Sequence, residues 1–267
     1  MEKQIGKLIG SGGTSDVHEW GDNEVIKIYK PHISDGTINH EEYIGKLLNK
    51  TFLNIPKLID SITIDGKSAL IYERKPGNIL AEPLLRGIYE KELAQKFAKM
   101  HYDIHMETII ELPKQYEFFY NRITGLSSIL GAKSDTLLEL LDSIPTETKL
   151  CHGDYQPLNI IGEAGDYTVI DWNGACSGNP VLDVAWTYLT LNSPVVKHLL
   201  GKEASELFTL FAEEYLSHYC QLSGINSTQV LKCLPLVAAR RLYDNNSSDT
   251  DVSKLEKDWL HQLLSDF

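Results

Sequence analysis

A change in hydrophobic periodicity near residue 75 constrains the fold of this 267-residue chain more than any other feature. Before it, short and partly alternating apolar runs are separated by glycine, asparagine and aspartate, as strands and turns are. After it, apolar residues recur at helical spacing, most clearly over 87–105 and 205–222. The sequence therefore predicts an α+β protein of two lobes, 1–75 and 76–267, with a hinge at Pro76-Gly77.

The N-terminal lobe is predicted to hold a small antiparallel sheet of five strands and one helix. Asp65-Gly66, between two strand-like runs, is the strongest short-range signal for a hairpin turn. The helix is expected at 37–50, where apolar residues are spaced as on one helical face. The strands are expected at 4–9, 16–20, 24–29, 58–64 and 67–73.

The C-terminal lobe is predicted to be mainly helical, with a few short strands embedded in it. One strand is expected at 148–152, and a hairpin of 159–162 with 167–171 follows it. A further helix is expected over 227–243, where the ring of Pro235 would remove a backbone donor and kink the helix.

The formal net charge of −12 argues against a nucleic-acid or anionic-membrane partner, because both need a basic surface. No apolar run approaches the roughly 18 residues of a membrane-spanning helix. The four cysteines are scattered, and the first residues contain no apolar core of a secretory signal. We therefore expect a cytoplasmic protein with reduced thiols, no nucleic-acid partner and no membrane partner.

The segment GSGGTSDV, residues 10–17, is unusually rich in glycine for an ordinary loop. Glycines let backbone N–H groups approach phosphate oxygens without a Cβ in the way. The next residues alternate like a strand, whereas a dinucleotide-binding motif would continue as a helix. A P-loop ending at Gly66-Lys67-Ser68 is excluded, because Ser61 occupies the position of its first glycine. The predicted nucleotide contacts are Gly10, Ser11, Gly12, Gly13, Ser15 and Val17.

Lys27 lies between apolar neighbours in the predicted strand 24–29, where an ammonium group is costly unless it is paired. Glu42, on the helix that follows, is the predicted partner and would aim the lysine at the α- and β-phosphates. A strand lysine after a strand–glycine loop–strand unit is typical of protein-kinase-like folds. The alternative is a solvated lysine and a solvated glutamate with no functional connection.

The run LCHGDYQPLN, residues 150–159, places several polar groups directly after an apolar strand. Asp154 is suited to accept a proton from a substrate hydroxyl, and His152 to fix the backbone of the loop. Asn159 and Asp171 supply oxygen ligands of the kind that Mg²⁺ prefers. The alternative is a structural turn rich in capping residues, but Asp171 at the end of a further strand favours the catalytic interpretation.

These segments resemble the aminoglycoside phosphotransferase family, within the wider group of choline-kinase-like and protein-kinase-like enzymes. LCHGDYQPLNII (150–161) resembles the catalytic loop of that family, and VIDWNGACSGNPVLDVAW (169–186) resembles its metal-binding segment. Weaker likeness extends the resemblance over residues 1 to about 190. The resemblance implies a bilobal protein-kinase-like fold, with a small sheet lobe and a larger helical lobe.

The resemblance also implies roles for individual residues. It assigns the base to Asp154, the metal to Asn159 and Asp171, and the orientation of the phosphates to the predicted pair of Lys27 and Glu42. It makes Asp183 a buried residue that bonds to the backbone of the catalytic loop. It places the base of ATP or GTP against the backbone of three residues, Glu73, Arg74 and Lys75.

The predicted function is ATP- and Mg²⁺-dependent transfer of the γ-phosphate to a hydroxyl of a small molecule. The acidic chain favours a neutral or cationic acceptor. The family that it resembles holds antibiotic-inactivating enzymes and kinases of hydroxylated metabolites. The choice of acceptor is expected in the segments 112–125 and after residue 195, where Arg240 and Arg241 either meet a carboxylate or cap helix ends.

Two alternatives to this function stay open. A protein kinase is disfavoured, because the sequence has neither an Asp-Phe-Gly after the metal aspartate nor an Ala-Pro-Glu segment. A nucleotide-binding pseudoenzyme, which senses or scaffolds without turnover, is disfavoured because all the expected polar groups are present.

Overall fold

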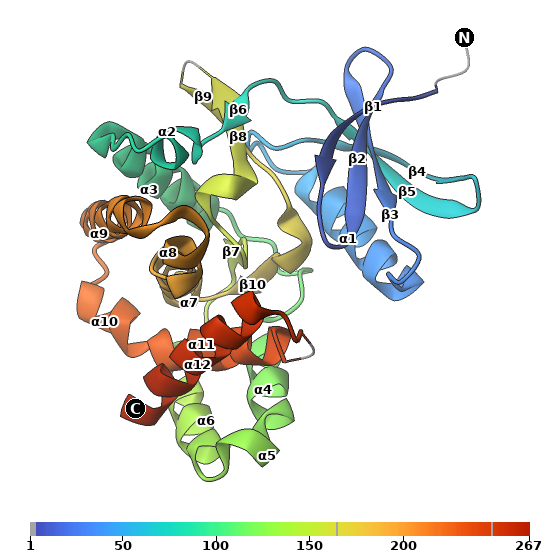
Figure 1. The fold of residues 1–267 in the computed structure, drawn as a ribbon. Helices are drawn as coiled ribbons and strands as arrows, with labels where there is room; N and C mark the ends of the chain where they lie inside the picture. Colours follow the sequence, from blue (N-terminus) through green and yellow to red (C-terminus); the bar gives the residue numbers. More distant parts are fainter. Residues whose placement is uncertain (1–3, 164, 247) are drawn as a thin grey trace. The chain divides into compact units, whose positions relative to one another are not determined.

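The computed structural model describes residues 4–163, 165–246 and 248–267. The chain packs as two compact units, whose helices and strands are labelled in Figure 1. The first unit combines Met1–Leu80 with Leu158–Asn173, and the second combines Ala81–Pro157 with Gly174–Phe267. The segment 158–173 thus packs with the N-terminal strands, although it follows residues 75 and 76. The boundary between two lobes that the sequence predicts at residues 75 and 76 stays a prediction.

Among the described residues, the first unit contains an antiparallel sheet of five strands in the order β1-β2-β3-β5-β4, as predicted. The Asp65-Gly66 turn joins β4 to β5, and both residues have the positive φ that a tight hairpin of this kind requires. Helix α1 (Asp35–Leu48) packs against the sheet, and the side chain of Ser34 caps its first turn. The strands are β1 (Ile5–Ser11), β2 (Ser15–Trp20), β3 (Glu24–Tyr29), β4 (Leu58–Ile64) and β5 (Lys67–Glu73).

Alternate residues of β3 divide between the two faces of this sheet. Ile26 packs with Ile71 on one face, whereas Tyr29 packs with Ile38 of α1 on the other face. Lys27 lies on the same face as Tyr29 and is therefore directed toward α1. The alternation of β3 thus decides which helix supplies a partner for the lysine.

A second, smaller sheet belongs to the first unit and has the order β6-β8-β9. β6 (Asn78–Ile79) pairs antiparallel with β8 (Ile160–Glu163), which forms the predicted hairpin with β9 (Asp166–Val169). Gly77, just before β6, has a φ of 109°, and a Cβ there would lie 2.3 Å from the carbonyl carbon of Gly162. This close approach of two backbones needs glycine at position 77. The pairing of β6 with β8 brings the segment 158–173 back to the first unit.

The second unit is mainly helical, and α3 and α9 pack against each other in it (Figure 1). Phe97 of α3 stacks on Tyr155 with 4.4 Å between ring centroids, and its ring lies 5.3 Å from that of Phe211 of α9. Two short strands, β7 (Lys149–Cys151) and β10 (Cys176–Gly178), pair antiparallel. The helices are α2 (Glu82–Leu85), α3 (Lys91–Met106), α4 (Gln115–Gly125), α5 (Ser127–Leu130), α6 (Lys133–Ser143), α7 (Pro180–Leu191), α8 (Pro194–Leu200), α9 (Lys202–Ser223), α10 (Ser227–Lys232), α11 (Leu234–Asp244) and α12 (Asp251–Asp266). Within the described ranges, no helix has the length and apolar character that a membrane crossing requires.

The structure divides the helix predicted over 227–243 in two, so the expectation of one kinked helix is wrong. α10 ends at Lys232, and α11 begins at Leu234. Pro235 lies in the first turn of α11, where a backbone N–H has no partner within the helix in any case. The proline therefore starts a helix instead of bending one.

The two glycines Gly77 and Gly66 separate the effect of steric contact from that of backbone conformation. Both have positive φ, but a Cβ at Gly66 would meet nothing within 4 Å. We expect Gly66→Ala to lower the free energy of unfolding by about 1 kcal/mol, from conformation alone. Gly77→Ala should lower it by about 3 kcal/mol or more, because the new methyl group meets backbone atoms that cannot yield. Equal losses for the two variants in chemical denaturation would contradict the close approach of Gly77 and Gly162.

Candidate active site

The ammonium group of Lys27 lies among charged partners in the first unit. Its Nζ is 2.6 Å from Oε1 of Glu41 on α1 and 3.6 Å from Oδ1 of Asp171, in the segment that follows β9. The side chain of Lys27 is only 14% exposed, so its charge needs such partners. Strand β3, helix α1 and the segment after β9 therefore hold one cation between two carboxylates.

Glu42, which the sequence analysis paired with Lys27, is not its partner in the structure. Glu42 pairs instead with Lys46, one turn further along the same helix. The buried face of α1 contains Ile38, Glu41 and Ile44, at a spacing of three residues. That periodicity was readable in the sequence and would have selected position 41.

Tyr72 of β5 supports the same pair from the sheet. Its hydroxyl donates to Oε1 of Glu41 at 3.1 Å. Burial, together with the neighbouring charge of Glu41, raises the pKa of Tyr72 well above its ordinary value. The phenol therefore stays protonated and remains a donor, which holds the Glu41 carboxylate toward Lys27.

Asn159 and Asp171 lie at the same end of the β8-β9 hairpin. The N–H of Ile170 donates to the carbonyl oxygen of Asn159 at 2.9 Å, and Asp171 is the next residue along the chain. Asp171 has a φ of 61°, which is uncommon for a residue with a side chain, and its carboxylate is 48% exposed. An exposed carboxylate on strained backbone, next to an amide-bearing residue, fits an oxygen-ligand site for a hard cation such as Mg²⁺.

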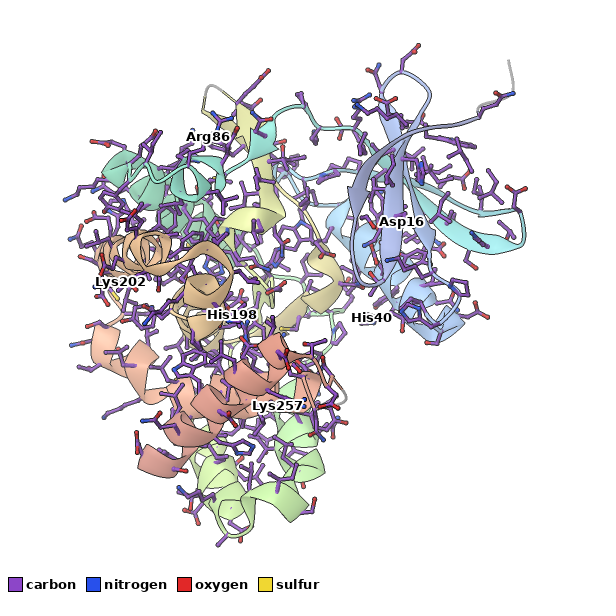
Figure 2. The ribbon with its side chains drawn as sticks, viewed as in Figure 1. Asp16, His40, Arg86, His198, Lys202 and Lys257 are labelled. Carbon is purple, nitrogen blue, oxygen red and sulfur yellow. The ribbon has the colours of Figure 1, made fainter. Side chains whose placement is uncertain are left out.

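The glycine loop joins β1 to β2 as a strand–loop–strand unit, as predicted. A Cβ added at Gly13 would meet nothing within 4 Å, and one at Gly10 or Gly12 would make only ordinary contacts. Neither packing nor backbone conformation therefore requires glycine at these positions, but a ligand that approaches the backbone would. Asp16 on β2, labelled in Figure 2, accepts a hydrogen bond of 2.6 Å from the hydroxyl of Ser11.

The remaining predicted nucleotide contacts lie on β2 and at the end of β5. Ser15, which occupies the place of a third glycine, is buried, and Val17 is half-buried. The backbone N–H groups of Glu73 and Arg74 donate to the carbonyls of Lys57 and Asn23, both at 2.9 Å. These two N–H groups are already used within the first unit. A cavity of about 390 Å³ is lined by residues 73–76 together with Asn54, Glu163, Asp166 and Thr168.

Asp154 lies in the second unit, on the loop after β7. Its Oδ1 accepts a hydrogen bond from the indole Nε1 of Trp186, and its Oδ2 accepts one from Nε2 of Gln156, both at 3.0 Å. Two neutral donors therefore fix the orientation of the carboxylate. A cavity of about 370 Å³ beside it is lined by Asp154, Gln156, Trp186, Thr190, Arg240, Arg241, Asp244 and Asn245.

Asp183 holds the backbone of the Asp154 loop, which confirms the role expected for it. The N–H of His152 donates to Oδ2 of Asp183 at 2.7 Å, and the N–H of Gly153 donates to Oδ1 at 2.8 Å. His152 is fully buried, and its Nδ1 accepts from the N–H of Asp154 at 3.2 Å. His152 therefore contacts the loop backbone, as predicted.

Two buried histidines of α3, His101 and His105, also bind Asp183 and were missed in the sequence analysis. Their Nε2 atoms lie 3.0 and 3.3 Å from Oδ2 of Asp183. Because a carboxylate only accepts, each Nε2 carries a proton, and each Nδ1 accepts from a tyrosine hydroxyl of α9, Tyr215 or Tyr219. The signal was the spacing of four residues, which places both histidines on one face of a helix.

Burial, with the nearby His105, lowers the pKa of His101 from its ordinary value of 6.5 to about 3. Burial would raise the pKa of Asp183, but the hydrogen bonds from the two histidines lower it well below its usual range. His101 is therefore neutral and the Asp183 carboxylate is ionised near pH 7. The His101–His105–Asp183 group has the chemistry of metal ligands, but each histidine nitrogen already takes part in a hydrogen bond.

These shifts predict how stability depends on pH. As pH falls below about 6.5, the unfolded chain takes up a proton at His101 before the folded protein does, so stability is lost progressively toward pH 3. We expect this group to remove about 2 kcal/mol from the free energy of unfolding between pH 7 and pH 5. His101→Gln should be less stable at pH 7 but flatter over this range. The free energy of unfolding is measured by urea denaturation at each pH. If it fell with pH in His101→Gln as steeply as in the wild type, the neutral, buried state of His101 would be contradicted.

The chain is similar in sequence to several known proteins. The model of the phosphotransferase enzyme family matches residues 6–224. The chain is 23% identical over 220 residues to the Protein LicA homolog of Mycoplasma capricolum. That match covers 81% of this chain and 83% of the Mycoplasma protein. It is 24% identical over 216 residues to the mouse Acyl-CoA dehydrogenase family member 10. That match covers 70% of this chain but only 20% of the mouse protein.

Solved structures with the same fold include kinases of small molecules. The amicoumacin kinase hAmiN, in complex with AMP-PNP, Ca²⁺ and Ami, superposes with a TM-score of 0.68 at 15% identity, over 97% of this chain and 87% of that chain. The ADP-bound aminoglycoside phosphotransferase APH(2'')-Ib superposes with a TM-score of 0.62 at 16% identity, over 98% of this chain and 93% of that chain. These likenesses confirm the predicted protein-kinase-like fold.

Proposed function

This chain belongs to the phosphotransferase enzyme family, and we propose that it transfers the γ-phosphate of ATP, bound with Mg²⁺, to a hydroxyl group of a small molecule. The observation that carries the proposal is the contact of Lys27 with Glu41 and with Asp171 at 3.6 Å. Phosphoryl transfer needs positioned charge more than covalent help from the protein. A partly buried lysine held beside an exposed carboxylate supplies such charge for a triphosphate and its metal.

Asp171 and Asn159 are the residues that we assign to the metal. Their side chains offer oxygen atoms, which Mg²⁺ prefers, and few protein ligands suffice because Mg²⁺ retains several waters. The bound metal would neutralise negative charge on the phosphates. The strained backbone of Asp171 supports the assignment, because such strain concentrates at functional residues.

The other residues of the first unit would bind and orient the nucleotide. Glu41, whose carboxylate accepts from the hydroxyl of Tyr72, holds the Lys27 ammonium, which we assign to the α- and β-phosphates. The open backbone of Gly10 to Gly13 would donate N–H groups to phosphate oxygens. At the end of β5, where the N–H groups of Glu73 and Arg74 are used, we assign the backbone N–H of Lys75 to the adenine.

Asp154 is the group to which we assign the proton of the acceptor hydroxyl. Hydrogen bonds from Trp186 and Gln156 fix both carboxylate oxygens, so the base is oriented before the acceptor arrives. The cavity of about 370 Å³ beside Asp154 is large enough for a small molecule. We therefore assign this cavity of the second unit to the acceptor.

The charges around this cavity favour a neutral or cationic acceptor. Arg241 donates to Glu256 and to Thr190, so its positive charge is balanced within the unit. Arg240 donates to a backbone carbonyl and lies 3.7 Å from Asp244. The named substrates of the superposed kinases, amicoumacin and the aminoglycosides, are the first acceptors to test. The free cysteines suit the reducing conditions of the cytoplasm, which we propose as its location.

Glu41 and Glu42 form a matched pair that tests the phosphate-orienting contact. Glu41→Gln should lower kcat/KM for MgATP by about 10- to 100-fold, because the Lys27 ammonium loses its charged partner. Glu42→Gln makes the same chemical change one residue away, and should leave kcat/KM within about twofold. Steady-state kinetics decides between them. A larger loss of kcat/KM in Glu42→Gln than in Glu41→Gln would contradict the Lys27–Glu41 pair and favour Glu42 as the partner of Lys27.

The acceptor is found by measuring nucleotide turnover with a panel of alcohols. The panel combines MgATP or MgGTP with aminoglycosides, amicoumacin, choline, neutral sugars and phosphorylated or carboxylated alcohols. We expect phosphorylation of a neutral or cationic member, and a loss of about 10²- to 10⁴-fold in kcat for Asp154→Asn with unchanged MgATP affinity.

Three results would contradict the proposal. MgATP binding without transfer to any acceptor would indicate a nucleotide sensor. Phosphate on serine or threonine of an added protein would indicate a protein kinase. Selective turnover of anionic alcohols would contradict the proposed charge of the acceptor.

A further inference from the structure

Arg240 reaches the Asp154 loop from a part of the chain beyond residues 6–224, which the family model matches. Its side chain extends from α11 and is only 8% exposed. Nη2 donates to the carbonyl oxygen of Gly153 at 2.7 Å. Gly153 is the residue directly before the proposed base.

Aromatic rings compensate the burial of this guanidinium group. Its Cζ lies 3.9 Å from the ring centroid of Trp186 on α7 and 4.8 Å from that of Phe118 on α4. Desolvating a cation is costly, and contact with ring faces offsets part of that cost. One side chain of α11 therefore links two other helices to the catalytic loop.

These contacts converge on the carboxylate of Asp154 by two routes. The peptide group that joins Gly153 to Asp154 has its C=O held by Arg240 and its N–H held by Nδ1 of His152. In addition, the indole that stacks on Arg240 is the one that donates to Oδ1 of Asp154. Arg240 thus contacts both the backbone before the base and the side chain that orients the base.

We propose that Arg240 is a positioning residue for phosphoryl transfer, which acts on Asp154 through Gly153 and Trp186. The proposal rests on the assignment of Asp154 as the base. Arg241, its neighbour on the same helix, donates to Glu256 and Thr190 instead of to the loop. Cζ of Arg241 also lies 5.4 Å from the centroid of the Trp186 ring, farther than the 3.9 Å of Arg240. The hydrogen bond to Gly153 therefore distinguishes position 240 from position 241. Lysine could carry the charge but lacks the planar group that stacks on the indole.

The structural half of the proposal is tested by the indole N–H signals of the four tryptophans in ¹⁵N NMR spectra. Trp186→Phe identifies the signal of Trp186. In Arg240→Met, we expect that signal to shift and its proton to exchange faster with water, because the indole loses its stacking partner. The signals of Trp20, Trp172 and Trp259 should stay in place. An unchanged Trp186 signal would overturn the proposal without reference to any substrate.

The functional half is tested by hydrolysis of MgATP with water as the acceptor. Arg240→Met should lower kcat by about 100-fold, since misplacing a catalytic group by about 1 Å has an effect of that size. MgATP affinity in calorimetry should stay within about twofold of the wild type. Arg240→Lys should recover part of kcat, because it keeps a donor and the charge. Wild-type kcat in Arg240→Met would overturn the proposal, even if its Tm were lower.

Lys133→Met is the matched control for a purely structural loss. Lys133 also donates to backbone carbonyls of the second unit, those of Leu264 and Ser265, but far along the chain from the loop. We expect its Tm to fall while kcat and the Trp186 signal stay unchanged. An equal loss of kcat in Lys133→Met and Arg240→Met would overturn the positioning role.

The comparison with Asp154→Asn separates this proposal from the proposed function. Normal turnover in Asp154→Asn would refute the base itself. Low turnover in Asp154→Asn with normal turnover in Arg240→Met would refute only the role of Arg240. If Arg240→Met does not fold, Arg240→Lys carries the test, and wild-type kcat in that variant would overturn the proposal.

Discussion

The buried carboxylate of Asp183 is the interaction on which the geometry of the second unit depends. It accepts two backbone N–H groups of the Asp154 loop and one N–H from each of two histidines of α3. A buried carboxylate is costly unless it accepts hydrogen bonds, and four donors contact its two oxygens, three of them at Oδ2 and one at Oδ1. Tyrosines of α9 in turn fix the tautomers of the histidines. The packing of α3 on α9 thus sets the position of a loop that neither helix contains.

The first unit solves a similar problem with a cation. Lys27 of β3 is largely buried, and its positive charge pairs with the carboxylates of Glu41 on α1 and Asp171 after β9. Tyr72 limits the freedom of Glu41, so the acceptor of the lysine is itself fixed. In both units, a charge that is expensive to bury is stabilised by donors or acceptors from elements far apart in sequence.

Local pattern was sufficient to predict the strands of the five-stranded sheet, the Asp65-Gly66 hairpin and the polar loop of 150–159, because each depends on neighbours in sequence. The short strands β6 and β10 were not predicted. Pairings across elements were harder to predict. Glu41 was missed in favour of Glu42, although the helical period pointed to position 41. Two histidines of α3 were missed because their partner lies some eighty residues away in the chain. The break before Pro235 was predicted as a kink. A proline within a helical pattern of apolar residues does not show whether it bends one helix or begins a second one.

The return of the β8-β9 hairpin to the first unit has a consequence for dissecting the protein. A fragment that ended at Leu80 would contain β6 but neither of the strands that complete its sheet, and it would lack Asp171. Leu80 donates its N–H to the carbonyl of Ile160 at 2.8 Å, so the two ends of the intervening chain are adjacent. A short linker from Leu80 to Leu158 would therefore bypass residues 81–157 and keep both parts of the first unit in one continuous chain.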